Sequence, residues 1–534
     1  MNQLKKIFFF SIVAILFTAC NKEYGKPSWD TDIAAPLVKT SLNINNLVSD
    51  TLLHINSDSS LTLVYNSNLY NFSTDSLLNI PDTTTKYNYN LPSGSFTFSP
   101  GQLIVNQPQT TRYSLKGVEL TNTAIKSGSF IFSIKSYVKG ITDYTYAIPS
   151  ATLNGVPFSI SVQVPAATST TPGVYSGTYS LANYKIDLKG PNENSVNTIT
   201  SSMQASLDAS EVSGVAVYPA DSIIISNTYY QIVPSYARGY FGQQTFNVGP
   251  ATTGVTIFSR ITNGNIQLQN ASMVLTINNG FGIDATANIN SLTSINTHSS
   301  STVPLVNSVI GSAININRAT ETGNPSNPVN ASVYAVSMNN TNSNITNLIG
   351  NLPNEFGYGI KIMTNPLGNV SGSNDFMYAG HTITANLDIQ VPLALVANNL
   401  TLEDTVNTNF SPPSGNSHLN NGTFTLWANN GFPFSAYVQL YLLNQNNQIV
   451  DSLCANNFIN PAPLNSSNIV ISPLMTALSI PLSSAKMTEL QNTKKIIVKS
   501  IFNTSNKPAY LKLYSYYSMD LKLTGNFNYT ISLH

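Results

Sequence analysis

Apolar and polar residues alternate in short runs along most of the chain, and Asn, Gly, Pro and Ser interrupt these runs. A period of two with frequent turn residues predicts β-strands. The clearest case is LKLYSYYSMDLKL (511–523), which predicts one long strand with an apolar face and a polar face. We therefore expect an all-β protein.

Helical patterns are few and short. The segment 342–356 must end or kink near Pro353, because proline cannot continue a helix. The segment 483–495 begins on serine hydroxyls and ends on two lysines, as the helix dipole favours. Both segments predict short connector helices within a β structure.

One phrase occurs twice, as SMVLTINNGFGIDATANI (272–289) and TFTLWANNGFPFSAYVQL (423–440). Asn278 and Asn429 occupy the same place in the two copies and lie 151 residues apart, a distance typical of a domain rather than of a solenoid repeat. A fainter third copy is GSFIFSIKSYVKG (128–140), which lacks the Asn-Asn-Gly turn.

Each copy predicts a β-hairpin with an odd-numbered loop. Asn-Gly usually forms a two-residue turn, but a loop centred on Gly431 places the apolar residues of both strands on one face. Pro433 also favours an opened turn, because it has no N–H to donate. The predicted apolar face of the second copy contains Phe424, Leu426, Ala428, Phe434, Ala436, Val438, Leu440 and Leu442. That of the first copy contains Met273, Leu275, Ile277, Ile283, Ala285, Ala287 and Ile289.

These patterns predict tandem β-sandwich domains on a flexible N-terminal tether. The expected segments are a signal peptide (1–19), the tether (20–35), an N-terminal β domain (36–215), a first sandwich repeat (216–370) and a second sandwich repeat (371–534).

Composition narrows the possible partners. Only 9% of the 534 residues are charged and the formal net charge is zero, so nothing steers the protein to nucleic acid or to an anionic membrane surface. Hydrophobic residues at 42% and aromatic residues at 10% exclude a disordered chain.

The N-terminus has a basic pair, a short apolar run and small residues before Cys20, the order of a secretory signal. LFTAC (16–20) resembles the lipobox of bacterial lipoproteins, although Phe17 departs from the usual Leu. The resemblance implies that Cys20 becomes the first mature residue and carries diacylglycerol and palmitate chains, which would anchor the protein to a membrane. Asn21 in place of a retention Asp implies the outer membrane, on either its periplasmic side or the cell surface. The alternative is an ordinary secreted protein.

Two broader resemblances concern the body of the chain. The segment PFSAYVQLYLLNQNNQIVDSL (433–453) is similar to the β-sandwich of late-embryogenesis-abundant domains of the water-stress type. The lipobox, PSWDTDIAAPLV (27–38) and the Asn-rich strands together resemble large surface lipoproteins of Bacteroidota. Neither resemblance implies a catalytic residue or a cofactor.

Residues with catalytic or metal-binding chemistry are sparse. Glu403 and Asp404 are adjacent, so on a strand they point to opposite faces and cannot act as a glycosidase pair. Cys454 is better explained as a buried apolar residue than as a nucleophile. The histidines have no metal or triad spacing and are His54, His298, His381, His418 and His534. We therefore expect no catalytic residues, no metal and no cofactor, and hence no enzyme.

One surface is a candidate for ligand or partner binding. If the second copy is a hairpin, Trp427, Tyr437 and Tyr441 share the face opposite the apolar one. Exposed aromatic side chains can stack on sugars or anchor a partner protein. The alternative is that this face packs against the second sheet or a neighbouring domain.

Three classes of function follow, in order of preference. The first is a non-catalytic, lipid-anchored protein of the cell envelope that acts in adhesion, structure or assembly through contacts with an envelope protein or surface. The second is a glycan-binding lipoprotein that takes polysaccharide for a transporter. The third is an enzyme whose site is assembled from distant strands.

Overall fold

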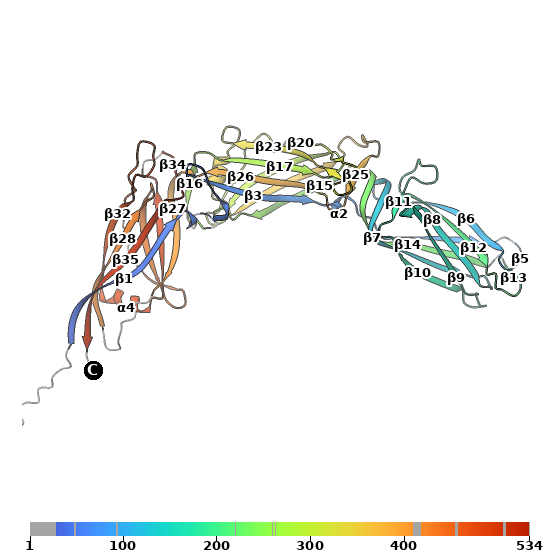
Figure 1. Cartoon of the computed structure of the whole chain (residues 1–534), viewed down its shortest axis with the longest axis horizontal. Coiled ribbons are helices and arrows are strands. Elements are labelled where there is room, and N and C mark those ends of the chain that lie inside the picture. Colours follow the sequence, from blue (N-terminus) through green and yellow to red (C-terminus); the bar gives the residue numbers. More distant parts are fainter. Residues whose placement is uncertain are drawn as a thin grey trace, which may run out of the picture.

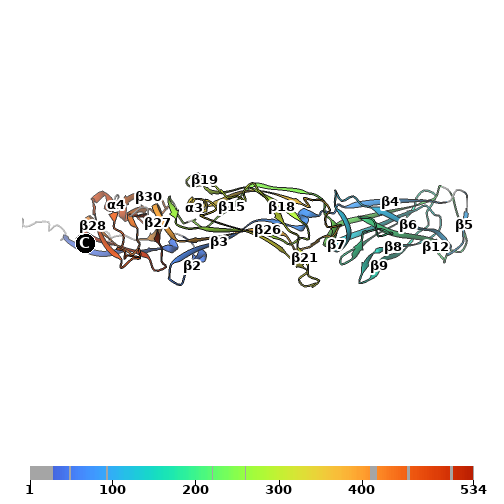
Figure 2. The same cartoon turned by 90° about the horizontal axis from the view of Figure 1, so that it is seen from above.

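The computed structural model describes residues 28–532, apart from residues 47, 49, 92, 93, 95, 219, 259, 262, 409–417, 454–457 and 506–508. The protein is all-β, as predicted, and its strands form three units in a curved row (Figures 1 and 2). We call the unit that contains β1 and β35 the proximal unit, the next the middle unit, and the one at the opposite end the distal unit.

Each unit is a β-sandwich with eight main strands. The proximal unit contains β1 (Ser28–Asn43), β27 (Ala394–Asn407), β28 (His418–Asn430), β29 (Ser435–Leu443), β30 (Ile449–Leu453), β32 (Leu474–Leu482), β33 (Lys495–Asn503) and β35 (Ser518–Ser532). The middle unit contains β3 (Leu61–Phe72), β15 (Thr245–Gly254), β17 (Ser272–Asn279), β18 (Ala285–Asn296), β19 (Ser301–Pro304), β23 (Ser332–Asn339), β24 (Glu355–Thr364) and β26 (Ile383–Pro392). The distal unit contains β4 (Thr83–Asn90), β6 (Leu103–Arg112), β7 (Glu119–Ser136), β8 (Thr142–Leu153), β9 (Val156–Val164), β10 (Gly173–Ser180), β12 (Thr198–Leu207) and β14 (Ser222–Tyr240).

The three units have one topology. When the eight strands of a unit are counted along the chain, one sheet has the order 1-8-3-6 and the other has the order 2-7-4-5, with antiparallel pairing throughout. Two four-stranded sheets connected in this way form a jelly roll.

Short elements connect or extend these sandwiches. The short strands are β2 (Leu53–Ile55), β5 (Phe96–Phe98), β11 (Lys185–Asp187), β13 (Val215–Val217), β16 (Asn263–Leu268), β20 (Ala313–Ile316), β21 (Thr320–Glu321), β22 (Val329–Asn330), β25 (Asp375–Tyr378), β31 (Phe458–Ile459) and β34 (Leu511–Lys512). The helical elements are η1 (Ile44–Asn46), η2 (Asp50–Leu52), α2 (Thr74–Leu77), α3 (Ile345–Gly350) and α4 (Ser484–Asn492). The two predicted connector helices are thus confirmed as α3 and α4. Among the described residues, no helix is both long enough and apolar enough to cross a bilayer.

The units are nested rather than consecutive. In each unit the first strand pairs with the last, so β1 pairs with β35, β3 with β26, and β4 with β14. The middle unit is therefore inserted between β1 and β27, and the distal unit between β3 and β15. This pairing differs from the predicted consecutive domains 36–215, 216–370 and 371–534. Residues 28–35 of the predicted tether also belong to β1. The alternation of apolar and polar residues could not predict this nested order, because it contains no information on which distant strands pair.

The repeated phrase forms a connection between sheets, not a hairpin. β17 and β18 belong to opposite sheets of the middle unit, and β28 and β29 belong to opposite sheets of the proximal unit. The predicted hairpins are therefore wrong, whereas every residue of the two predicted apolar faces is buried. Two strands that face each other across a core carry the same inward alternation as a hairpin with one buried face, so the pattern could not separate the two arrangements.

A buried amide holds each of these connections. The side chain of Asn430 donates to the carbonyls of Phe434 (2.8 Å) and Asn460 (2.9 Å) and accepts from the Phe432 N–H (3.0 Å). The same three hydrogen bonds recur in the middle unit, where Asn279 donates to Ile283 and Asn317 and accepts from Phe281, all at 2.9 Å.

The third, fainter copy occupies the equivalent place in the distal unit. Ser136 stands where the other units have asparagine, and it accepts a single long hydrogen bond from Val138 N–H (3.4 Å). The N–H of Tyr137 donates to the carbonyl of Ser222 at the start of the eighth strand, as that of Gly280 does to Thr382 and that of Gly431 does to Ser518. The chain therefore contains three copies of one sandwich.

The predicted long strand 511–523 is interrupted. β34 ends at Lys512, a turn closes with the Tyr517 N–H donating to the Tyr514 carbonyl (3.1 Å), and β35 begins at Ser518. The residues of the predicted apolar face, from Leu511 to Leu523, are nonetheless buried.

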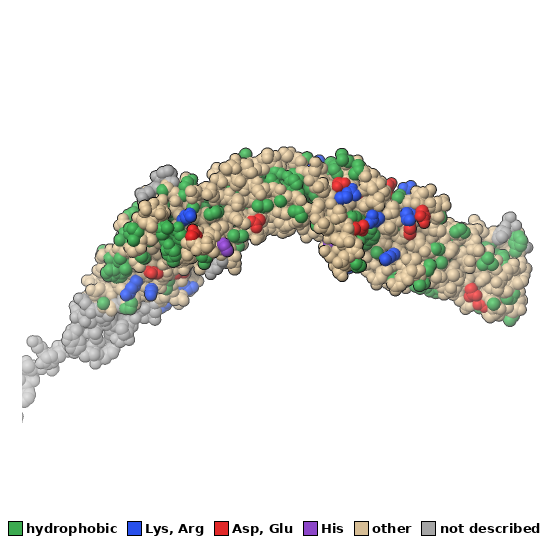
Figure 3. Space-filling model, turned by 45° about the horizontal axis from the view of Figure 1, so that its top comes forward, with side chains coloured by type: hydrophobic (Ala, Val, Ile, Leu, Met, Phe, Trp, Pro, Cys, Tyr) green, Lys and Arg blue, Asp and Glu red, His purple; other side chains and the backbone are tan. Residues whose placement is uncertain are grey.

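Strands cross both junctions between units. β16 of the middle unit pairs with β27 and so extends a proximal sheet, and β25 of the middle unit pairs with the end of β14. Across the second junction, Arg238 of β14 forms an ion pair with Glu321 of the middle unit. Within the middle unit, Arg318 contacts Asp284 (2.6 Å) and Asp375 (3.5 Å), a residue of β25. Figure 3 shows several charged side chains near this part of the molecule.

Candidate interaction surface

The structure separates the three aromatic residues predicted to share a surface. Trp427 lies on β28, whereas Tyr437 and Tyr441 lie on β29 in the opposite sheet. The prediction of one common face is therefore wrong, because it rested on the hairpin. Trp427 is 41% exposed and Tyr437 is 43% exposed, so neither side chain is covered by a second sheet or another unit.

Trp427 and Tyr437 each contact a residue of the proximal unit. The indole N–H of Trp427 donates to the Thr524 hydroxyl (3.2 Å), and the ring of Tyr437 packs against Phe458 with centroids 5.3 Å apart. They form two small apolar spots on opposite sides of the proximal unit rather than one binding face.

The other described residues with possible chemistry do not converge. Glu403 pairs with Lys499 (3.2 Å) on β33, whereas Asp404 accepts a hydrogen bond from Thr40 on β1. Within the described residues, no three His, Cys, Asp or Glu side chains are close enough together to hold a metal ion. Cys20 and Cys454 lie outside the described residues.

A tyrosine recurs at the same place in each unit. It lies four residues before the residue at the start of the eighth strand whose carbonyl accepts a hydrogen bond from the connection between the third and fourth strands. These residues are Tyr514, Tyr378 and Tyr218 in the proximal, middle and distal units. In each case the tyrosine carbonyl accepts from the N–H three residues later, at 2.9 to 3.2 Å. The three side chains therefore occupy equivalent positions at the end of their sandwich.

The following unit contacts two of these three tyrosines. Tyr514 is 6% exposed, and its backbone forms a β-bridge with Ser60, which directly precedes β3 of the middle unit. Tyr378 packs against Tyr236 of the distal unit, with ring centroids 4.7 Å apart. Tyr218 has no following unit and is 45% exposed, and the Lys139 ammonium lies 5.1 Å from its ring centroid.

Tyr218 belongs to an exposed apolar end that we call the distal tip, defined by Phe96, Tyr137, Val212 and Tyr218. Phe96 begins β5, which pairs with β13 at the far end of the molecule (Figures 1 and 2). All four side chains are exposed, Val212 almost completely, and Figure 3 shows hydrophobic side chains at this end. In the described chain β13 pairs only with β5, whereas the equivalent β25 pairs with a strand of the next unit.

Sequence reasoning missed the distal tip. The available signal was a tyrosine four residues before Ser or Thr in YPADS (218–222), YAGHT (378–382) and YSYYS (514–518). This signal has meaning only once the three units are aligned by their strands.

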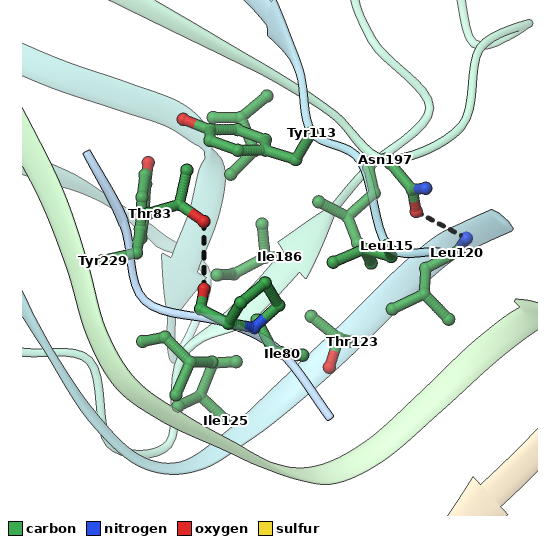
Figure 4. A pocket seen from close by; sticks show the side chains of 14 residues that line it. Ile80, Thr83, Tyr113, Leu115, Leu120, Thr123, Ile125, Ile186, Asn197 and Tyr229 are labelled. Carbon is green, nitrogen blue, oxygen red and sulfur yellow. Dashed lines mark hydrogen bonds between the residues drawn. The ribbon is translucent and has the colours of Figure 1, made fainter. Parts of the chain in front are cut away.

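A small cavity lies inside the distal unit, close to the middle unit (Figure 4). It measures about 70 Å³, and its lining is mostly aliphatic, with Leu120, Ile125 and Ile186 among the residues. Asn197 lies at its edge and accepts the Leu120 N–H (2.7 Å), so its carbonyl oxygen is not available to a ligand there. An apolar cavity of this size is expected to stay dry and is a packing defect rather than a reaction site.

No protein-family model and no curated protein sequence matches this chain. The resemblance to late-embryogenesis-abundant domains therefore finds no support there.

Two solved structures are distantly similar to this chain. A Parabacteroides distasonis protein, provisionally described as secreted, is 9% identical and covers 92% of this chain and 99% of its own length, with a TM-score of 0.27. The triple jelly-roll turret protein of an archaeal virus is 12% identical and covers 84% of this chain and 96% of its own, with a TM-score of 0.12. Scores this low carry no argument, so the jelly-roll assignment rests on strand order alone.

Proposed function

We propose that this protein is a non-catalytic, lipid-anchored component of the cell envelope that holds a protein-binding tip away from the membrane. Its role would be adhesion, structure or assembly. The observation that carries the proposal is the exposed Tyr218, because the equivalent Tyr378 and Tyr514 are both engaged by another sandwich.

The proposed occupant of the distal tip is a β-sandwich domain of another envelope protein. At the equivalent end of the middle unit, β25 pairs with β14 and Tyr378 packs against Tyr236 of the incoming unit. A partner would use the free edge of β13 in the same way, since an unpaired strand edge readily accepts another strand. The exposed side chains of the tip would supply the apolar part of the contact.

The lipid anchor is supported by the resemblance of LFTAC (16–20) to a lipobox. β1, which follows this segment, lies in the proximal unit, at the opposite end of the row from β5 and β13 (Figure 1). A lipid on Cys20 would therefore place the distal tip far from the membrane, as a contact with a second protein or surface requires.

Site-specific photo-crosslinking in the native cells tests this proposal. A benzophenone side chain at Tyr218 or Tyr137 should give a discrete protein adduct, and the same probe at Tyr230, an exposed tyrosine on β14, should not. Val212→Asp should abolish the adduct, because it puts a charge into the apolar contact. An adduct with a second copy of this chain, an adduct with lipid or polysaccharide alone, or equal labelling from Tyr230 would refute the proposed occupant.

A further inference from the structure

An open groove lies where the distal unit meets the middle unit. It encloses about 750 Å³ and is lined by parts of β7, β8, β11 and β14 from the distal unit and by Tyr378 at the end of β25. This volume is within the range of small-molecule sites, about 300 to 1,000 Å³. The groove is separate from the distal tip and from the proximal aromatic residues.

The floor of the groove is a polar row contributed by three neighbouring strands. β11 pairs with both β7 and β8, which places Asp187 opposite Asn122 and Ile186 opposite Ala151, next to Ser150. Asp187 is already engaged, because it accepts from the Lys189 N–H (2.8 Å) and forms an ion pair with the Lys189 ammonium (3.2 Å).

Two polar atoms of this row lack partners. The carbonyl oxygen of the Asn122 side chain and the hydroxyl of Ser150 are buried, and neither has a hydrogen bond within the described residues. A buried polar group left without a partner costs about 1 to 3 kcal/mol. Both residues line the groove, so a ligand there could satisfy them. Asn122 needs a donor, and Ser150 can either donate or accept.

One wall of the groove is a fixed pair of tyrosines. The rings of Tyr236 and Tyr378 have centroids 4.7 Å apart at an angle of 49°. Arg238 donates to the Tyr236 hydroxyl (2.7 Å), and the Tyr378 hydroxyl donates to Glu321 (3.0 Å), which also pairs with Arg238. Rings held in this way lose little conformational freedom when a flat apolar group packs on them.

The chemistry of the lining points to one class of ligand. Its polar groups are mainly amide and hydroxyl groups, and its charged side chains are Lys185 and Asp187, of which Asp187 forms an ion pair with Lys189. Donor and acceptor atoms along a floor, beside aromatic rings, match a molecule with many hydroxyl groups and apolar C–H faces. We propose that this groove binds a short neutral oligosaccharide, with Asn122 and Ser150 bonding its hydroxyls and the tyrosine wall packing against a sugar ring.

The test uses the full chain with Cys20→Ala, to keep it in solution, and saturation-transfer NMR. The probes are maltotriose, cellotriose, mannotriose, xylotriose and chitotriose, with trigalacturonate as the anionic probe. At least one neutral trisaccharide should receive saturation, and Ser150→Ala should raise its Kd about tenfold. Tyr378→Ala should raise the Kd at least as much, with near-UV circular dichroism checking that the fold persists.

Matched controls distinguish this site from others. Ser159→Ala removes an exposed hydroxyl on β9, Trp427→Ala removes the exposed indole of the proximal unit, and both should leave the Kd unchanged. Val212→Asp should retain sugar binding, so failure of the distal tip proposal and failure of this one can be told apart. Absence of saturation for every neutral probe, binding of trigalacturonate alone, or an unchanged Kd in both Ser150→Ala and Tyr378→Ala would overturn the proposal.

Discussion

Asn430→Ala should destabilise the proximal unit strongly. The Asn430 side chain is fully buried and makes three hydrogen bonds, to two carbonyls and one N–H, at 2.8 to 3.0 Å. Alanine leaves all three backbone groups without that partner. At about 1 kcal/mol for each hydrogen bond, the free energy of unfolding of this unit should fall by about 3 kcal/mol.

Tryptophan fluorescence during urea unfolding measures this change in one unit only. The chain has two tryptophans, Trp29 on β1 and Trp427 on β28, and both belong to the proximal unit. With a slope of about 2 kcal/mol per molar urea, the fluorescence midpoint should fall by about 1.5 M. The matched control is Asn429→Ala on the same strand, which removes a half-buried side chain outside the core and should cost less than about 0.5 kcal/mol.

Equal midpoints for Asn430→Ala and Asn429→Ala would refute the reasoning. Such a result would mean that the hydrogen bonds of the Asn430 side chain contribute no net stability, or that the connection between β28 and β29 rearranges without loss of stability. Ser136→Ala is a control for unit specificity, because Ser136 lies in the distal unit, which contains no tryptophan, and its loss should leave the fluorescence midpoint unchanged.

Three further results are expected. Cys20→Ala should release the protein from membranes into the soluble fraction, and persistent membrane association would defeat the lipid anchor. Leu120→Ala should enlarge the distal cavity and cost about 3 to 4 kcal/mol, seen as faster hydrogen exchange in β7 by mass spectrometry; unchanged exchange would mean that the cavity wall collapses. Burial raises the pKa of Tyr113 and of Tyr517 to about 12, above the ordinary value of 10, so the unfolded chain loses these protons first. The free energy of unfolding should therefore stay constant up to about pH 10 and decrease between about pH 10 and 12. Equal urea midpoints at about pH 8 and about pH 11.5 would contradict this prediction.

The sequence predicts the buried faces of the strands better than their pairing. Phe424, Leu426 and Phe434 are in the core as expected, because a period of two identifies which side of a strand is apolar whatever its partner. The same period cannot say whether β28 and β29 are neighbours in one sheet or opposed across a core. The predicted aromatic surface was wrong for that reason, because only a hairpin would have placed Trp427 and Tyr437 on one face.

The order of the units and the candidate sites depended on long-range contacts. Nothing near Asn43 in the sequence indicates that it pairs with Ser518. The distal tip and the groove between the distal and middle units likewise combine residues from segments far apart in the chain, such as Asn122 with Tyr378 in the groove. The third copy of the repeat was visible in Phe130 and Phe132, but its lack of Asn-Asn-Gly hid its equivalence, because Ser136 takes the place of the asparagine.

The nested insertion sets the order in which the three units can fold as the chain is made. All eight main strands of the distal unit lie between Thr83 and Tyr240, so this unit can fold as soon as β14 is available. The middle unit must wait for β26 and the proximal unit for β35, which follows all the other described strands. Until then β1 and β3 are strands without their partners, open to pairing with other chains. The proximal unit is therefore the last part of the protein to mature, and a nascent molecule assembles from the distal unit inward.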